Sequence, residues 1–323
     1  MSHNKLPVGT TLITGGGGFI GHALIKRLLL KPERRIIVVG RSLSPKFPLP
    51  EAVVYHSGDI SDQAFIGPLL DCATEVVDLA YGTTPKTSYD DPIQDVILNL
   101  PASVTLQRLA SERKIRRYVL VSSGGTVYGN PKYLPIDELH PNNPISPYGI
   151  SKLVTEKYAS FFFQMMGLPV IIARPSNAYG VGQFGRRPQG FIGVSMHAVL
   201  NGLDIEIFGE RGTVRDYIYI DDLADGLASL LENGIVGETY NIGSGIGYDN
   251  IDVLSMLHEV VGAKYPIRTV HRPLRPFDVP ANVLNSEKLT VATGWVPKYS
   301  LKQGIEEMWH QLVKPGDLPG WVA

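Results

Sequence analysis

A tyrosine and a lysine stand four residues apart at Tyr148 and Lys152, in a stretch whose composition favours a helix. Residues i and i+4 of a helix lie on the same face, one turn apart. A phenol, with a pKa of about 10, is a poor base at neutral pH unless a neighbouring cation stabilises its phenolate. The pair is therefore a candidate for moving the proton of an alcohol, with an ordinary surface pair as the alternative. The same spacing at Tyr128 and Lys132 encloses a glycine and a proline and cannot be a helical turn.

A run of glycines at residues 15–21 (GGGGFIG) separates a β-branched stretch at residues 10–14 from an amphipathic stretch at residues 19–30. Glycines let a backbone turn sharply between a strand and a helix and approach a pyrophosphate without a Cβ in the way. The helix N-terminus then offers free N–H groups and the positive end of its dipole to the phosphates. The pattern predicts a dinucleotide site rather than a purely structural turn. Its predicted contacts are Gly15, Gly18, Phe19, Ile20 and Gly21.

The second predicted strand, at residues 35–39, ends in Gly40, Arg41 and Ser42, where an NAD enzyme usually offers an acid to the adenosine ribose. A guanidinium at this place favours a 2′-phosphate. NAD is therefore the predicted cofactor with NADP as the alternative, unless Arg41 is only an exposed loop residue. Asp59 and Ile60 follow the next strand, where Asp59 either accepts from the adenine amine or belongs to a turn.

The elements that must position these residues alternate between strands and helices. Further strands are predicted at residues 75–79, 117–122 and 169–173, and further helices at 92–112 and 148–166, the former containing Pro101. This rhythm predicts an α/β fold, a Rossmann-type doubly wound parallel sheet with helices on both faces. After about residue 176 the rhythm weakens, and a smaller C-terminal α/β substrate-binding domain is expected. We assign residues 1–176 and roughly 213–245 to the dinucleotide-binding domain, and residues 177–212 and 246–323 to the second domain.

Composition excludes several classes of protein. The 30 Lys and Arg against 31 Asp and Glu give a formal net charge of −1, without the basic excess typical of proteins that bind nucleic acid or anionic membranes. Cys72 is the single cysteine, and no Cys/His cluster has metal-ligand spacing, so no metal is expected. The apolar stretch at 161–173 is too short and too broken to span a bilayer. A cytoplasmic protein without a signal segment is the expectation.

Taken together, these motifs make the chain resemble the extended short-chain dehydrogenase/reductase family, in its NAD-dependent nucleotide-sugar epimerase/dehydratase branch. The resemblance covers nearly the whole chain. It lies in the glycine loop at residues 14–21, the strand end at 78–80, the strand end at 122–129 (SSGGTVYG), the helix start at 146–152, and the segments at 173–180 and 215–222.

The resemblance implies roles for residues that the spacing alone does not identify. Further cofactor contacts are implied for Ala80, Asn99, Ser122 and Pro175, together with Tyr148 and Lys152. Implied nucleotide-sugar contacts are Ser123, Asn177, Glu206, Phe208, Arg215, Arg275, Asp278 and Asn282. For the arginines the physics agrees, since planar guanidiniums match the charges of a diphosphate. Ordinary surface salt bridges are the alternative.

One departure from the family pattern concerns the active site. The family normally has Ser or Thr at the position of Gly124, bonded to the reacting sugar hydroxyl, so Ser123 or Thr126 is expected to replace it, unless a water does. Members that remove water from the sugar carry an Asp-Glu pair where this chain has Gly125 and Thr126, so dehydration is not expected. Asn282 stands where a bulky Tyr restricts some members to glucose and galactose, which leaves room for a 2-acetamido group.

The resemblance implies a reversible C4 epimerase of a UDP-sugar, either UDP-GlcNAc/UDP-GalNAc or UDP-Glc/UDP-Gal, acting through a 4-keto intermediate on tightly bound cofactor. The alternatives are an NADPH-dependent reductase of a 4-keto nucleotide sugar and a non-catalytic dinucleotide sensor. The helices at 92–112 and 148–166 carry more apolar surface than one sheet face covers, and residues 161–163 (FFF) cannot all face inward. A homodimer through a four-helix bundle, as in the family, is expected.

Overall fold

Alternating β-branched runs form a central parallel sheet in the computed structural model, which describes residues 9–183, 190–275 and 278–313. Its strand order is β10-β6-β5-β4-β1-β2-β3, with every neighbouring pair parallel. The strands are β1 (Thr10–Thr14), β2 (Arg35–Gly40), β3 (Val53–Ser57), β4 (Glu75–Asp78), β5 (Arg117–Val121), β6 (Val170–Pro175) and β10 (Thr239–Ile242). The predicted doubly wound α/β fold is confirmed.

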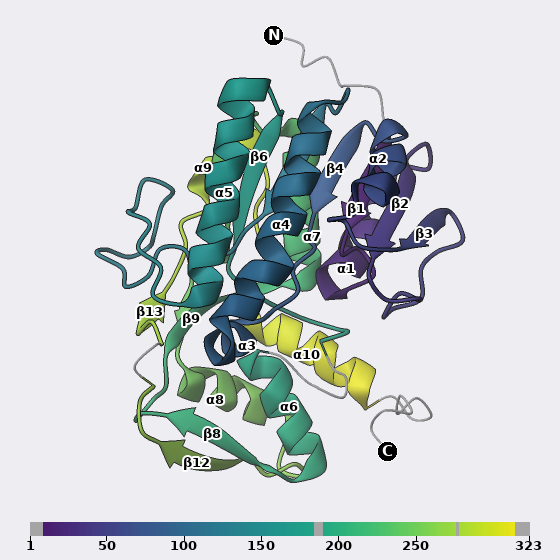
Figure 1. Cartoon of the computed structure of the whole chain (residues 1–323). Helices are drawn as coiled ribbons and strands as arrows, with labels where there is room; N and C mark the ends of the chain where they lie inside the picture. Colours follow the sequence, from purple (N-terminus) through teal and green to yellow (C-terminus); the bar gives the residue numbers. More distant parts are fainter. Residues whose placement is uncertain (1–8, 184–189, 276–277, 314–323) are drawn as a thin grey trace.

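Successive side chains of the central strands enter two different cores. Leu12 and Val76 pack into one apolar cluster, whereas their neighbours Ile13 and Val77 pack into another. Because side chains of a strand alternate between the faces of a sheet, the near-continuous apolar runs of β1 and β4 require helices on both faces. This is why the sheet is buried between two helical layers (Figure 1).

The two helical layers come from different parts of the chain. One layer contains α1 and α7, which pack against each other, and the other contains α2, α4 and α5. The helices of these layers and the two short ones beside them are α1 (Phe19–Leu28), α2 (Gln63–Asp71), α3 (Pro85–Asp90), α4 (Pro92–Ser111), α5 (Pro147–Met166), α7 (Ile220–Asn233) and α9 (Glu287–Thr293).

The predicted helices agree with the observed ones apart from their ends. The helix expected at residues 19–30 ends at Leu28, where Leu29 forms its C-cap. Pro101 lies inside the continuous helix α4, where its missing N–H leaves the carbonyl of Ile97 without its usual helical donor. No helix of the described residues is long and apolar enough to cross a membrane.

The remaining elements form a smaller layer beyond the carboxyl ends of the central strands (Figure 1). The strand β9, from within residues 213–245, joins this layer, whereas α7 and β10 from the same stretch belong to the central part. Its strands are β7 (Asn177–Tyr179), β8 (Asp204–Phe208), β9 (Val214–Tyr219), β11 (Gly247–Tyr248), β12 (Arg268–Arg272) and β13 (Ala281–Asn282). Its helices are α6 (Phe191–Asn201), α8 (Asn250–Val261) and α10 (Leu301–Leu312).

Candidate active site

The glycine loop between β1 and α1 adopts the shape that its sequence predicts. Gly15 has a φ of +67°, in the left-handed region, and a Cβ there would lie 3.0 Å from backbone atoms of Ala80. A Cβ on Gly21 would lie 2.4 Å from the Cα of Gly16, so the first turn of α1 packs directly on the loop backbone. The helix begins after Gly18, and no side chain of the described residues caps it. Its first N–H groups are therefore available to an anion.

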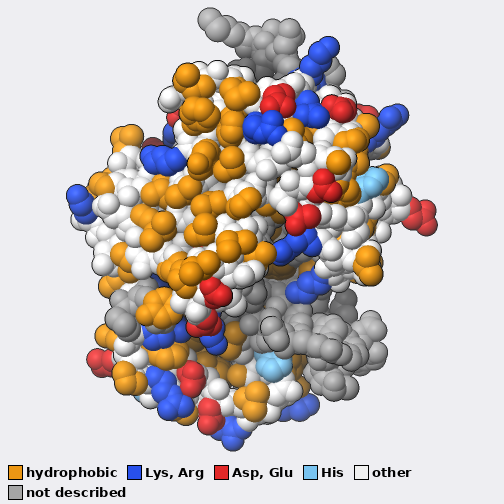
Figure 2. Space-filling view, in the orientation of Figure 1, with side chains coloured by type: hydrophobic (Ala, Val, Ile, Leu, Met, Phe, Trp, Pro, Cys, Tyr) orange, Lys and Arg blue, Asp and Glu red, His pale blue; other side chains and the backbone are white. Residues whose placement is uncertain are grey.

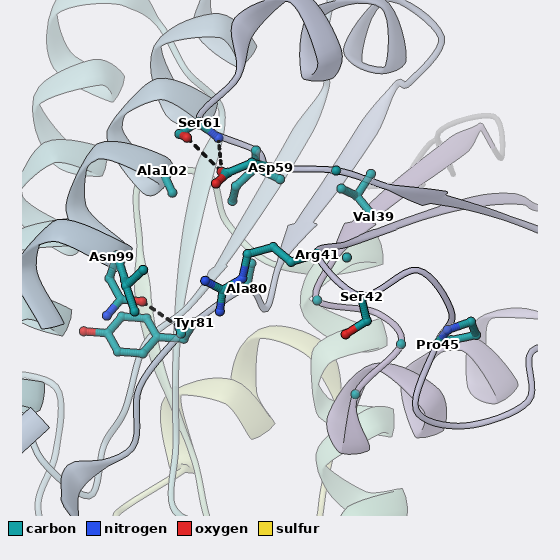
Figure 3. A pocket seen from close by; sticks show the side chains of 18 of the residues that line it. Val39, Arg41, Ser42, Pro45, Asp59, Ser61, Ala80, Tyr81, Asn99 and Ala102 are labelled. Carbon is teal, nitrogen blue, oxygen red and sulfur yellow. Dashed lines mark hydrogen bonds between the residues drawn. The ribbon is translucent and has the colours of Figure 1, made fainter. Parts of the chain in front are cut away.

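A cavity of about 460 Å³ opens beside this loop at the carboxyl edge of the sheet (Figure 3). Loops after β1, β2, β3 and β4 surround it, and α4 closes one side. Among its lining residues are Gly15, Gly18, Arg41, Asp59, Ile60, Ala80, Tyr81 and Asn99. Ligands of open α/β sheets bind at this edge. The glycine cradle, the uncapped helix terminus and the cavity together fit the predicted dinucleotide.

The end of the cavity next to β2 is basic and hydroxyl-rich. Arg41 extends into the cavity towards Tyr81 and Asn99 (Figure 3), and a Cβ on Gly82 would lie 3.1 Å from its Nη2 atom. The side chains of Ser42, Ser44 and Lys46 are exposed around it. At position 40, where many NAD enzymes have an acid, a Cβ would lie 2.7 Å from the Tyr55 hydroxyl, so the position favours glycine.

Asp59 is occupied by its own turn. Its carboxylate accepts hydrogen bonds from the N–H and the hydroxyl of Ser61, both at 2.8 Å, and these bonds lower its pKa. The neighbouring Ile60 is buried and lines the same cavity. The sequence left open whether Asp59 belongs to a turn or accepts from the adenine amine. The bonds to Ser61 show the turn, and the position of Asp59 at the cavity wall is compatible with an adenine contact as well.

Tyr148 lies in the first turn of α5, which local signals position. Ser146 is the N-cap and accepts a hydrogen bond from the N–H of Gly149, and a proline follows it at the first helical position. The N–H of Tyr148 donates to the hydroxyl of Ser88 on α3 at 3.2 Å. A Cβ on Gly149 would lie 2.7 Å from the carbonyl oxygen of Thr126. The helix start is thus held closely against the strand end at 122–129.

Lys152 lies one turn further along α5 and is almost completely buried, with 6% of its surface exposed. Its Nζ atom donates to the carbonyl of Val121 at 2.9 Å and lies 5.9 Å from the ring centre of Tyr148. Burial lowers the pKa of Lys152 to about 8, although Asp78, Glu156 and Asp95 oppose the shift. The predicted pair is therefore brought together, with an ammonium whose charge is poorly hydrated.

The pKa of the Tyr148 phenol is raised above its ordinary value, chiefly by burial and further by the negative charge of Asp95. Without an added positive charge, the phenol therefore remains protonated at neutral pH. A cationic partner in the cavity next to it would lower this pKa, which is the effect that the sequence argument requires of a bound oxidised nicotinamide.

Four polar side chains gather around Gly124, where the family pattern has Ser or Thr. The amide nitrogen of Asn282 donates to the Gly124 carbonyl at 3.0 Å, and this residue is only 1% exposed. A Cβ on Gly125 would lie 3.6 Å from Oδ1 of Asn177 and 3.9 Å from Oγ of Ser123. The hydroxyl of Thr126, Nδ2 of Asn177 and Oδ1 of Asn282 are buried and have no hydrogen-bond partner among the described residues. Unsatisfied buried groups are costly, so this cluster fits a polar ligand.

The glycine at position 124 is matched to its surroundings. A Cβ there would lie 2.5 Å from Cδ1 of Leu284 and 2.8 Å from the carbonyl oxygen of Arg174. A Ser or Thr at this position would therefore displace Leu284 and press on a backbone atom that cannot move freely. The space that the family's hydroxyl would occupy is filled by a leucine from the C-terminal part of the chain.

The predicted nucleotide-sugar residues of the smaller layer form a second group. The guanidinium of Arg275 lies 4.0 Å above the ring centre of Phe208, and its Nε donates to Asp278 at 2.8 Å. Arg215, on β9, lies near the charges of both Arg275 and Asp278, and burial lowers the pKa of Arg215. Glu206 is exposed and pairs with Arg272 instead of joining this group.

The other predicted residues are placed as follows. Ser122 donates its hydroxyl to the buried Glu156, which also pairs with Arg174, so its side chain serves this network. Asn99 accepts from the N–H of Gly82 at 2.6 Å and shapes the cavity wall. Phe19 and Ile20 begin α1, and Pro175 ends β6.

Sequence reasoning missed Tyr81, whose ring lies against both members of the pair. The ring centre is 4.0 Å from Nζ of Lys152 and 4.9 Å from the ring centre of Tyr148. No spacing marks Tyr81, and the only signal was its place directly after the strand end at 78–80. Asp78, at that strand end, is buried and accepts from Thr14 at 2.6 Å and Tyr118 at 3.0 Å.

In the described part of the chain no group of three or more His, Cys, Asp and Glu side chains could hold a metal ion. The site therefore consists of a cavity beside the glycine loop, a Tyr-Lys pair that Tyr81 connects to this cavity and whose lysine is buried, a cluster of unsatisfied polar atoms, and an arginine-containing group in the smaller layer.

Known proteins are similar to this chain over nearly its whole length. The model of the NAD dependent epimerase/dehydratase family matches residues 11–243. The UDP-glucose 4-epimerase of Mycolicibacterium smegmatis is 31% identical over 307 residues, which cover 91% of this chain and 96% of that protein. The dTDP-4-dehydro-6-deoxyglucose reductase of Escherichia coli is 32% identical over 309 residues, covering 92% and 95%. The crystal structure of the Thermus thermophilus UDP-glucose 4-epimerase in complex with NAD superposes with a TM-score of 0.84 at 30% identity, covering 93% and 97% of the two chains.

Proposed function

Because this chain belongs to the NAD dependent epimerase/dehydratase family, we propose that it interconverts the C4 epimers of a UDP-sugar through a 4-keto intermediate. It is an enzyme of the extended short-chain dehydrogenase/reductase type, and NAD is its cofactor. The observation that carries the proposal is the Tyr148-Lys152 pair, whose lysine is buried and which is linked to the cavity beside the glycine loop through Tyr81, a residue that lines the cavity and contacts both.

Tyr148 is the proposed base and acid of the reaction. Its phenolate takes the proton of the sugar C4 hydroxyl and returns it to the epimeric hydroxyl. Gly15, Gly18 and the start of α1 would hold NAD, which when bound would supply a reversible acceptor for the C4 hydride. Lys152 contributes a positive charge next to the phenol, which lowers the cost of the phenolate in a site that otherwise raises the pKa of Tyr148.

Thr126 is the proposed partner for the reacting hydroxyl in place of the side chain missing at Gly124. Its buried hydroxyl lacks a hydrogen-bond partner among the described residues, whereas a side chain at position 124 would meet Leu284. Ser123 is the alternative donor, and its Oγ would lie 3.9 Å from a Cβ on Gly125. The unsatisfied Oδ1 of Asn282 and Nδ2 of Asn177 are further proposed sugar contacts, and the former suits an amide N–H of a 2-acetamido sugar.

The UDP part is proposed to bind between the central sheet and the smaller layer. Arg215 and Arg275 would hold the diphosphate, since planar guanidiniums match phosphate oxygens in pairs. Asp278 would accept from the ribose, and Phe208 would lie at the nucleobase end, which Glu206 would reach only by leaving its pair with Arg272. Anchoring the part that does not react leaves the 4-keto sugar free to turn before the hydride returns. On this proposal, residues 177–212 and 246–323 form the nucleotide-sugar-binding unit.

The direct test is to incubate the purified protein with UDP-GlcNAc, and separately with UDP-glucose, without added cofactor. Formation of UDP-GalNAc or UDP-galactose is expected, with the acetamido sugar preferred because of Asn282. Absence of both epimers, together with stoichiometric consumption of NADPH on a 4-keto nucleotide sugar, would identify a reductase instead. Cofactor binding without either reaction would favour a sensor.

The reductase is the second candidate because of the basic end of the cavity. Arg41, Lys46 and the hydroxyls of Ser42 and Ser44 line the cavity where β2 ends, the position proposed for the adenosine ribose, and Asp59 is bound to Ser61. This set suits a 2′-phosphate, and a reductase is among the similar proteins.

Replacing Arg41 by alanine tests this reading of the cavity. If the guanidinium binds a 2′-phosphate, Arg41→Ala weakens NADP⁺ binding by about 10–100-fold, the value of a charged hydrogen bond, and leaves NAD⁺ binding unchanged. Titration calorimetry of both cofactors measures the effect. Arg108→Ala, on the far part of α4 and paired with Glu112, is the control and changes neither affinity. Equal losses for both cofactors would count against a 2′-phosphate site.

A homodimer is proposed through the exposed apolar face of α4 and α5. Figure 2 shows apolar side chains gathered over these two helices. Their spacing fits one face of each helix, and they include Ile93, Val96, Ile97, Ile150, Tyr158, Phe161 and Met165. Of the phenylalanines at 161–163, Phe162 is buried and Phe161 is 51% exposed. Two copies of this helix pair would form the predicted four-helix bundle.

Placing a charge in this face is expected to separate the protomers. Phe161→Glu weakens the dimer by about 10²-fold or more, since a two-fold interface loses the same apolar contact twice. Light scattering at micromolar concentration would then report 35.3 kDa in place of twice that mass. The control is Leu139→Glu, which changes a 91% exposed leucine outside these helices and leaves the mass unchanged. A parent protein that is already monomeric would contradict the proposal.

A further inference from the structure

Hydrogen bonds fix the backbone of the loop that follows β4 on both sides of Tyr81. The N–H of Leu79 donates to the carbonyl of Thr14 at 3.1 Å, and that of Ala80 to the Thr14 hydroxyl at 3.3 Å. On the other side of Tyr81, the N–H of Gly82 donates to Asn99 at 2.6 Å. The backbone is therefore bound to β1 on one side and to α4 on the other, and the ring between them is directed at α5.

The ring of Tyr81 lies against the Lys152 ammonium, which also donates a hydrogen bond to the backbone. Nζ of Lys152 lies 4.0 Å from the ring centre and 2.9 Å from the carbonyl oxygen of Val121. The ring also meets Tyr148 edge to face, at an interplanar angle of 68°. An ammonium over an aromatic face is attracted by the negative charge of the ring face, and the attraction is strongest where water is excluded.

The carboxylates near Lys152 have other partners. Asp78 accepts from Thr14 and Tyr118, and Glu156 pairs with Arg174. Among the residues that the structure describes, Lys152 has no ion pair within 4.0 Å. The titratable and charged groups that face it are Asp78 on β4, Tyr118 on β5, Asp95 on α4, Tyr148 and Glu156 on α5, Arg174 on β6, and Tyr81 itself.

We propose that Tyr81 is a positioning residue, whose ring face keeps the Lys152 side chain charged and directed at Tyr148. This rests on the proposed function for its catalytic meaning, because Lys152 can stabilise the Tyr148 phenolate only while it is charged. The ring face adds to the negative charges of Asp78, Glu156 and Asp95, which already oppose the lowering of the Lys152 pKa by burial.

The sign of the pH effect follows from burial. The pKa of Lys152 is lowered to about 8, so the ammonium loses its proton as the pH rises through this value, and activity falls with it. Loss of the aromatic face removes a stabilisation of the charged form and lowers this pKa further. The alkaline limb of the kcat/KM profile then moves to lower pH.

The test compares Tyr81→Leu with Tyr81→Phe. Leucine keeps an apolar side chain in place and limits entry of water, which would itself hydrate the ammonium, whereas phenylalanine keeps the ring face. Tyr81→Leu is expected to lower the pKa of Lys152 by about one unit, and kcat/KM at pH 8 by about fivefold, the corresponding loss of the protonated fraction. Tyr81→Phe is expected to retain the parent values. Tyr81→Met serves as the second non-aromatic variant if Tyr81→Leu does not fold.

The pKa of Lys152 is measured without substrate, by NMR titration of protein carrying ¹³Cε-labelled lysine, with the signal assigned from its loss in Lys152→Arg. A lowered pKa in the leucine or methionine variant, restored in the phenylalanine variant, supports the inference even if the protein proves not to be an epimerase. An unchanged pKa in the non-aromatic variants overturns it, as does a phenylalanine variant that moves as far as they do.

Discussion

Replacing Tyr148 by phenylalanine is expected to lower kcat for epimerisation by about 10²–10⁴-fold, the usual contribution of a positioned acid-base group. The ring remains, and with it the edge-to-face contact with Tyr81 at 4.9 Å, so the fold and the cavity are preserved. Affinity for NAD is expected to stay within a few-fold of the parent. Steady-state kinetics on the UDP-sugar and calorimetric titration of NAD measure the two quantities separately.

The matched control is Tyr158→Phe. Tyr158 lies on the same helix α5, ten residues further along, on the face proposed for the dimer and outside the lining of the cavity. Removing its hydroxyl is expected to leave kcat unchanged. If Tyr148→Phe retained more than about a tenth of the parent kcat, proton transfer would have to come from another group, and Thr126 or a water would become the candidate base.

Replacing Gly21 by alanine is expected to weaken NAD binding by about 10–100-fold, and to lower the free energy of unfolding by about 1–3 kcal/mol. The added Cβ would lie 2.4 Å from Cα and 2.5 Å from the carbonyl oxygen of Gly16. Both are backbone atoms, so α1 must move away from the glycine loop. The N–H groups at the start of α1 then no longer point where a pyrophosphate would lie.

Gly167→Ala separates this effect from the general cost of losing a glycine. Gly167 ends α5 with a φ of +72°, where an L side chain is strained, and nothing lies within 4 Å of the added Cβ. We expect a loss of stability of about 1 kcal/mol or more, without any change in NAD affinity. Equal NAD affinity in the Gly21→Ala and parent proteins would show that the glycine loop does not hold the pyrophosphate.

The fold class could be predicted because it depends on patterns within short segments. Short runs rich in apolar and β-branched residues, such as those at β1 and β4, indicate strands of a parallel sheet that is buried on both faces. This inference does not require knowing which strands pair with each other. The start of α5 also depends on neighbouring residues alone, since Ser146 is the N-cap and a proline follows it at the first helical position, directly before Tyr148. The ends of helices were less certain, because the last turn of α1 depends on where the chain must next go.

The content of the active site depended on contacts between distant segments. Leu284 lies against Gly124 although 160 positions separate them, and no property of residues 122–129 indicates which side chain fills that space. In the same way, the position of Asp59 after a predicted strand suited a contact with adenine, and only the fold showed its two hydrogen bonds to Ser61.

By itself, then, the sequence determined the parallel sheet, the glycine loop and the one-turn spacing of Tyr148 and Lys152, because steric limits and hydrogen bonds along a short stretch of chain decide each of them. Only the tertiary structure decided which groups surround that pair. The ring of Tyr81 over the ammonium, the carboxylates bound to other partners and the leucine next to Gly124 all come from segments that meet in space. Their effect on charge and on room for a hydroxyl depends on distances of a few ångströms, which spacing along the chain does not encode.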